Sequence, residues 1–152
     1  MTNKELYQLT LFLPTGLLFP LHPQELRLLA LAMLRHIAPT GARLELALVR
    51  DAEIAELNAV YLGCQGPTNC LAFVDRAGLQ HGLCGNLFIS TDAVQRECFL
   101  YGQGASEHVA RLLAHGLAHL AGFEHGPQMD ALCAELEALA AQGTVGLAQK
   151  TA

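Results

Sequence analysis

Hydrophobic and polar residues alternate most regularly over Arg43–Val49, where every second residue is a leucine. A period of two is typical of a strand that buries one face and exposes the other. Tyr7–Leu13, Cys70–Val74 and Leu83–Ser90 are further short apolar segments, and we expect a strand in each of them. The pattern therefore predicts a small sheet built from strands that are far apart in the sequence.

Between these strands, apolar residues recur three and four positions apart, which indicates amphipathic helices. Ile54, Leu57 and Tyr61 would form the buried stripe of one helix, for which Asp51 would be the cap. The other helices are predicted over Gln24–Ile37, Asp92–Tyr101, Ser106–Ala121 and Pro127–Ala141, the last one ending at Gly143.

The composition indicates one helix-rich domain over residues 1–152, with 52% hydrophobic and 15% charged residues. The apolar run Leu112–Phe123 is too short for a membrane span and contains two histidines, so no membrane segment is expected. The net charge of −5 counts against a broad nonspecific surface for nucleic acid.

We expect a cytoplasmic location. The uncharged segment Tyr7–Leu21 contains Pro14 and Pro20 and has no A-x-A cleavage site, which argues against a signal peptide. The five cysteines are odd in number and form no C-x-x-C pair, as expected for reduced thiols. Cys70 and Cys84, on predicted strands, are interpreted as packing residues.

Three histidines have the spacing of a metal site, H-x-x-x-H-x-x-G-x-x-H. A helix brings His115 and His119 onto one face, and Gly122 can end that helix in the left-handed conformation. The chain can then return His125 to the same point. Three imidazoles leave one tetrahedral position for water or substrate, as in a catalytic zinc site. Nickel, copper or iron would also accept imidazole ligands, with zinc as the default.

Around this helix, His108 and Arg111 fall on the same polar arc as His115 and His119, while the rest of the circumference is apolar. A polar arc on an interior helix must face a cavity or a charged partner. The spacing is shared with metzincin peptidases, which carry a glutamate base directly after the first histidine. That position is Gly116 here, so peptidase chemistry of the usual kind is disfavoured.

The segment HGLAHLAGFEH resembles the H-G-x-L-H-L-x-G-Y-D-H signature of the YbeY family, bacterial endoribonucleases and rRNA maturation factors. Leu57-Asn58 with Tyr61, the segment 67–73 (PTNCLAF) and Leu83–Ser90 are similar to further motifs of that family, in the same order. The resemblance implies an α+β domain with a small mixed sheet packed against several helices, related to the zincin fold. It also implies one Zn²⁺ ion on the three histidines, an rRNA precursor as substrate, and small-subunit components of the ribosome as partners.

The chain departs from the family pattern at four positions where the family has a charged residue. Leu62 replaces an arginine that could bind phosphate, Asn69 and Asn86 replace acids, and Glu124 replaces an aspartate. Glu124 is a candidate catalytic residue that could orient water or a ligand ring, or else an exposed loop acid. Arg111 could take the place of the missing arginine, or else form an ion pair with a nearby acid.

The remaining polar residues have less specific predicted roles. Thr68 and Asn69 could contact a ligand beside the metal, or hold a turn with their side chains. His108 and His81 are interpreted as surface or cleft-rim residues.

The leading hypothesis is a zinc-dependent, single-strand-specific endoribonuclease of rRNA maturation and ribosome assembly. One alternative is a metal-bearing ribosome assembly factor with little catalysis, suggested by Leu62, Asn69 and Asn86. Another is a metallohydrolase acting on a non-RNA substrate, which Gly116 disfavours if that substrate is a peptide.

Overall fold

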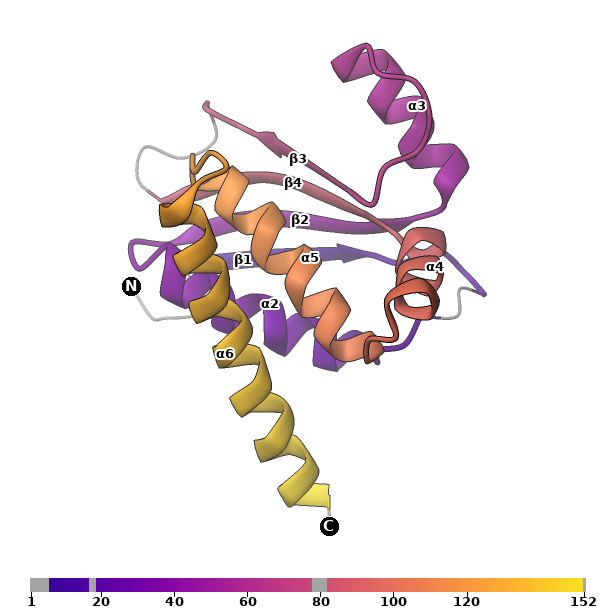
Figure 1. Ribbon diagram of the computed structural model, residues 1–152. Helices are drawn as coiled ribbons and strands as arrows, with labels where there is room; N and C mark the ends of the chain where they lie inside the picture. Colours follow the sequence, from indigo (N-terminus) through magenta and orange to yellow (C-terminus); the bar gives the residue numbers. More distant parts are fainter. Residues whose placement is uncertain (1–5, 17–18, 78–81, 152) are drawn as a thin grey trace.

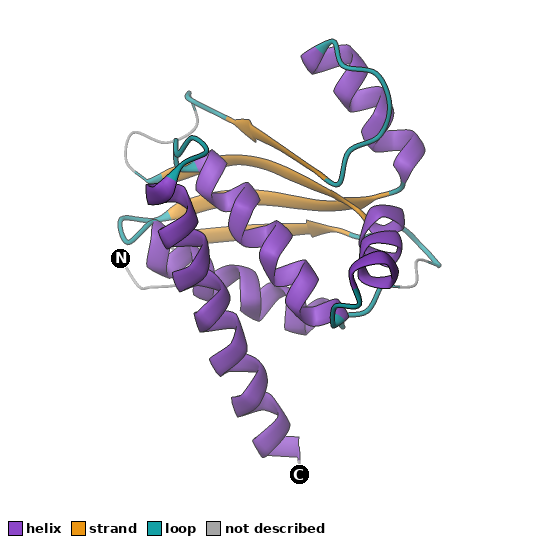
Figure 2. Cartoon of the chain, viewed as in Figure 1, coloured by secondary structure: helices purple, strands orange, loops and turns teal. Residues whose placement is uncertain are grey.

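A computed structural model of the protein describes residues 6–16, 19–77 and 82–151, with only the backbone described for 144–151. In chain order, the elements are β1 (Tyr7–Phe12), α2 (Pro23–Ile37), β2 (Ala42–Val49), α3 (Asp51–Leu62), β3 (Cys70–Val74), β4 (Leu83–Ser90), α4 (Thr91–Tyr101), α5 (Ala105–Leu120) and α6 (Pro127–Thr151) (Figures 1 and 2). Of the helices in this described part, none combines the length and apolar character that crossing a bilayer requires.

The four strands form one mixed sheet in the order β1-β2-β4-β3. β1, β2 and β4 are parallel to one another, and β3 pairs antiparallel with β4 at the edge. Helices α2, α5 and α6 lie on one side of the sheet, while α3 stands apart on the other side (Figure 1). The prediction of an α+β domain with a small mixed sheet is therefore confirmed.

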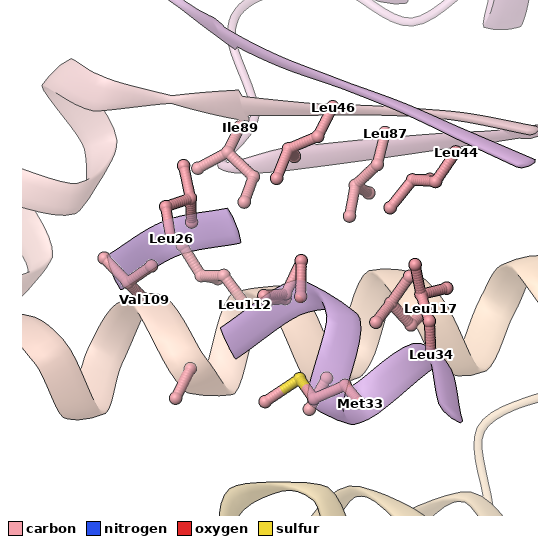
Figure 3. Close-up of a cluster of buried hydrophobic side chains, with 14 of the residues drawn as sticks. Leu26, Met33, Leu34, Leu44, Leu46, Leu87, Ile89, Val109, Leu112 and Leu117 are labelled. Carbon is pink, nitrogen blue, oxygen red and sulfur yellow. The ribbon is translucent and has the colours of Figure 1, made fainter. Parts of the chain in front are cut away.

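The main core lies between the sheet and helices α2 and α5. Leu44, Leu46, Leu87 and Ile89 point from β2 and β4 toward these helices and are fully buried (Figure 3). From the helix side, they meet Leu26, Leu34, Val109, Leu112 and Leu117. The alternation of Arg43–Val49 thus identified the buried face of β2 correctly, and it fixes α5, the helix with the histidines, against the sheet.

The start of α3 differs from the prediction, because Asp51 is its first residue and not its cap. The cap position is Arg50, whose side chain makes no capping bond. Instead, the carboxylate of Asp92 accepts the backbone N–H of Asp51 at 2.9 Å. Asp51 in turn accepts hydrogen bonds from Ser90 (2.8 Å) and Arg96 (2.9 Å), and the bond from Arg96 is the main reason that the Asp51 pKa lies below its ordinary value.

The predicted buried stripe of α3 is wrong at Tyr61, which is 66% exposed. Its place is taken by Asn58, which is buried and donates its side-chain N–H to the carbonyl of Gly66 at 3.0 Å. The reason is that α3 stands off the sheet (Figure 1), so the Tyr61 ring contacts Phe73 of β3 at 5.5 Å between centroids and leaves most of its surface exposed.

Helix α6 does not end at Gly143 as predicted but continues to Thr151. Gly143 does not adopt the left-handed conformation that ends α3 at Gly63 and α4 at Gly102. A glycine inside a helix costs about 1 kcal/mol relative to alanine but does not interrupt it.

Candidate metal centre

His115 and His119 lie one turn apart on α5, on the part of its surface that the sheet leaves uncovered. Both rings are half-buried, whereas Gly116, Leu117 and Ala118 between them are buried. The Nε2 atoms of the two rings are 3.2 Å apart. The 3.6-residue period predicted from the sequence therefore brings two ligand nitrogens to one point.

The third histidine reaches the same point because the chain reverses at Gly122. Gly122 has a φ of +94°, and the N–H of Phe123 bonds the carbonyl of Ala118 at 3.0 Å, which is the six-residue bond of a Schellman cap. The ring of His125 then lies 5.1 Å from that of His115 and 4.9 Å from that of His119, measured between centroids. The predicted convergence of the three histidines is confirmed.

The spacing of the ring nitrogens fits one ion. Ligand atoms from His115, His119 and His125 all lie within 4.8 Å of one another. Two nitrogens that each lie about 2.0–2.1 Å from a tetrahedral zinc ion would be roughly 3.3 Å apart. The 3.2 Å between the Nε2 atoms of His115 and His119 agrees with this value. The donor set and its geometry therefore fit a divalent metal ion.

The protonation of the rings also favours metal binding. Nδ1 of His119 lies 3.2 Å from the carbonyl oxygen of Phe123, which can only accept, so Nδ1 carries the proton and Nε2 has its lone pair free. Burial, followed by the neighbouring charges of His119 and His125, holds the pKa of His115 below its ordinary value. A neutral imidazole is the form that a metal requires.

An open hollow adjoins His125 and is formed by the loop between α5 and α6. Its lining runs from Ala121 to Gln128 and includes Glu124, which is exposed. The loop therefore leaves room beside the third ligand for a further molecule. The catalytic role of Glu124 stays a prediction, and its place in this hollow is compatible with it.

Arg111 is on α5, one turn before His115, but its side chain meets α6. Its Nε atom lies 3.6 Å from a carboxylate oxygen of Glu137. This is the ion pair that the sequence left open as the alternative. A role for Arg111 at a phosphate stays a prediction. Such a phosphate would compete with Glu137 for the guanidinium.

His108 is not at the surface or on a cleft rim as predicted, because only 4% of it is exposed. Its Nε2 lies 3.0 Å from Glu97 of α4, and the other oxygen of Glu97 accepts a hydrogen bond from the Asn69 side chain at 2.9 Å. Glu97 thus joins α4, α5 and the residue before β3. Glu97 was not identified from the sequence as the partner of His108, although the polar arc on α5 already required a cavity or a charged partner. His81 lies outside the described residues.

The same contact gives a physical reason for Asn69. An aspartate there would place a second carboxylate against Glu97 with no proton between them, whereas the amide donates one. The Asn69 side chain is thus used in a contact with another helix, and its predicted ligand contact stays a prediction. Thr68 is half-buried beside it, and its ligand role stays a prediction.

The two other departures from the family pattern lie away from the three histidines along the sequence and in the fold. Leu62 ends α3 and is 54% exposed. Asn86 sits on β4 opposite Phe73, next to Leu87, whose side chain points toward α5. Because side chains alternate along a strand, Asn86 belongs to the other face of the sheet.

Gly116, where a metzincin has its glutamate, points at the sheet. A Cβ on this residue would lie 2.4 Å from Cδ1 of Leu87 and 3.1 Å from Sγ of Cys70. A side chain at this position would enter the core, and the structure has no room for it. The packing role predicted for Cys70 agrees with this, since burial raises the pKa of its thiol to about 12.

Comparisons with known proteins identify the family of this chain. A family model described as Endoribonuclease YbeY matches residues 23–141. An Endoribonuclease YbeY of Oleidesulfovibrio alaskensis is 43% identical over 133 residues, covering 74% of this chain and 79% of that protein. One from Nitratidesulfovibrio vulgaris is 43% identical over 109 residues, covering 60% of this chain and 67% of that protein.

A solution structure of a protein from Thermotoga maritima has the same fold, with a TM-score of 0.64, 17% identity and 92% of each chain covered. The family model spans most of the chain, including all three histidines. The chain belongs to the YbeY endoribonuclease family.

Proposed function

We propose that this protein is a zinc-dependent, single-strand-specific endoribonuclease that acts in rRNA maturation and in ribosome assembly and quality control. The convergence of His115, His119 and His125 carries this proposal, because these three residues could hold a metal ion in a chain of this family. Residues 1–152 would form a single metal-dependent hydrolase domain. An rRNA precursor would be the substrate, and small-subunit components of the ribosome would be partners.

Zinc is the ion that best suits three neutral imidazoles, and the three histidines would hold it. When bound, such an ion lowers the pKa of water and polarises a phosphoryl oxygen. The protein contributes the orientation of the ligands, because the carbonyl of Phe123 fixes the ring of His119. Burial lowers the pKa of His115, which favours the neutral ring that a metal requires.

Two side chains would assist at the RNA. Glu124 lies in the hollow beside His125, from which it could orient water or accept a proton. Arg111 could bind a phosphate if it exchanged Glu137 for the substrate, since this ion pair is partly exposed.

A cytoplasmic location agrees with the cysteines. None of the five forms a disulfide, whether it is buried, as Cys84 is, or exposed, as Cys64 is. Free thiols in this number are ordinary in a reducing compartment and unusual outside it.

A metal-bearing assembly factor with little catalysis is the second candidate. The observation that favours it is the apolar, exposed Leu62 in place of a phosphate-binding arginine. Asn69 no longer supports this alternative, because its amide is needed beside Glu97. A peptide substrate is disfavoured, since Gly116 has no room for a base.

The test is cleavage of a structured RNA with single-stranded regions by the purified protein, with and without added zinc, alongside His115→Ala. His36→Ala is the matched control, because His36 is partly exposed and pairs with Glu135 on α6. We expect zinc-dependent cleavage that His115→Ala abolishes and His36→Ala retains. Cleavage unaffected by His115→Ala would exclude the metal mechanism, and co-sedimentation with ribosomal subunits without cleavage would favour the assembly factor.

A further inference from the structure

Among the described helices, α3 covers the face of the sheet opposite α5 (Figure 1). Its buried cluster is small and consists of Val49, Ile54 and Leu71, with half-buried neighbours that include Leu57, Phe73 and Phe88. The main core on the other face is several times larger. Part of the apolar surface on the α3 side therefore remains uncovered by the described chain.

The last turn of α3 presents large apolar side chains to solvent. Val60 is 68% exposed and Tyr61 is 66% exposed. The ring of Tyr61 is 5.5 Å from that of Phe73, which is 5.8 Å from that of Phe88, so an aromatic row runs from the helix across β3 and β4. Contiguous exposed apolar surface of this kind is typical of an interaction site.

A groove lies between α3 and this part of the sheet, and we name it the α3 groove. Its lining includes Leu57, Val60, Tyr61 and Phe88, together with the carboxylates of Glu53 and Glu56. Both glutamates are exposed, and in the described part of the chain neither takes part in an ion pair. The groove thus combines an apolar surface with two unpaired negative charges.

The charge selects the class of partner. Helix α3 carries Asp51, Glu53 and Glu56 and has no lysine or arginine. Carboxylates repel the phosphates of RNA but attract lysine and arginine side chains. The groove also belongs to the sheet face opposite the one that packs against α5 and its histidines.

We propose that the α3 groove binds a short cationic, amphipathic segment of a partner protein. Apolar residues of that segment would contact Val60, Tyr61 and Phe88, and its lysines or arginines would pair with Glu53 and Glu56. This is the helix-in-groove mode of recognition, with aromatic side chains as the main anchors. The proposal is independent of RNA cleavage, because it uses the face away from the histidines.

The test uses the full chain and two synthetic peptides of about 14 residues, long enough for a marginal helix. One peptide has leucines on one helical face and lysines on the other, and the second has glutamates in place of the lysines. Binding is measured by fluorescence anisotropy, and amide chemical-shift changes locate the peptide. We expect the lysine peptide to bind at least tenfold more tightly than the glutamate peptide, with shifts around α3 and β4.

Glu53→Lys/Glu56→Lys and, separately, Tyr61→Ala should each weaken binding of the lysine peptide at least tenfold. The matched control is Glu25→Lys/Glu135→Lys, which changes the net charge equally on α2 and α6. It should change the affinity less than twofold, and Glu53→Lys/Glu56→Lys should leave RNA cleavage unchanged.

Four results would overturn the proposal. Equal weakening by both double variants would mean nonspecific charge attraction, and absence of binding would mean that no cationic segment is accepted. Displacement of the peptide by a single-stranded RNA, or self-association of the protein that Tyr61→Ala abolishes, would assign the groove to RNA or to a second copy instead.

Discussion

Gly116 permits the close contact between α5 and the sheet, and Gly116→Ala tests that contact. The added Cβ would lie 2.4 Å from Cδ1 and 3.0 Å from Cδ2 of Leu87, and 3.1 Å from Sγ of Cys70. Leu87 is fully buried, so its side chain has no empty volume into which to turn. We therefore expect the substitution to act as overpacking.

Two effects of opposite sign set the magnitude. Overpacking a core costs about 1–3 kcal/mol, whereas alanine in place of glycine inside a helix gains about 0.5–1 kcal/mol. Gly143→Ala, in α6, is the control because a Cβ there meets nothing within 4 Å and only the helical gain remains. We expect the free energies of unfolding of the two variants to differ by about 1–3 kcal/mol, with Gly116→Ala the less stable.

Urea unfolding of the metal-free protein, followed by circular dichroism, measures both values. A double-mutant cycle then isolates the contact: Leu87→Ala alone should cost about 2–5 kcal/mol, and Gly116→Ala should become stabilising in that background. If Gly116→Ala stabilised the unaltered protein as much as Gly143→Ala does, α5 would not pack against β4 as closely as described.

Three further predictions concern the histidines and Glu97. His119→Ala should weaken zinc binding by at least about a hundredfold in chelator competition, while His36→Ala should not; equal affinities would exclude His119 as a ligand. In the metal-free protein, His115 has a lowered pKa, so below its ordinary value of 6.5 the unfolded chain binds a proton that the folded chain does not. The free energy of unfolding should therefore fall as pH drops through this region, and it should fall less steeply in His115→Gln. Urea unfolding at several pH values measures this, and the same pH dependence in both proteins would contradict the reasoning. Asn69→Asp should destabilise the protein by about 1–3 kcal/mol because it opposes Glu97, and adding Glu97→Gln should restore most of that loss in thermal melts.

Local patterns predicted the strands and the convergence of the three histidines, because both depend on short periods in the sequence. The predicted bounds Cys70–Val74 and Leu83–Ser90 are those of β3 and β4, and the spacing of the three histidines was sufficient to locate their meeting point. Gly122 indicated that the chain could reverse and bring His125 back to the other two histidines, because the reversal needs a residue in the left-handed conformation.

Contacts between elements could not be predicted in the same way. His108 and Glu97 lie on different helices, and only the packing of α4 against α5 brings them within 3.0 Å. Asp51 had the residue type of a cap, but the capping carboxylate comes from Asp92 in another helix. Tyr61 has the helical spacing of a buried residue, yet it contacts the ring of Phe73 on β3 and still leaves most of its surface exposed.

The reversal at Gly122 has a consequence for how the protein acquires its metal. The turn is held by backbone bonds from Gly122 to His119 and from Phe123 to Ala118, and none of these needs an ion. The histidines are thus preorganised, and the entropy of gathering them is lost when the chain folds rather than when metal binds. Unlike a zinc finger, which is unfolded without its ion, this protein would fold first and load its metal afterwards. Metal supply could then control its activity without changing how much folded protein the cell contains.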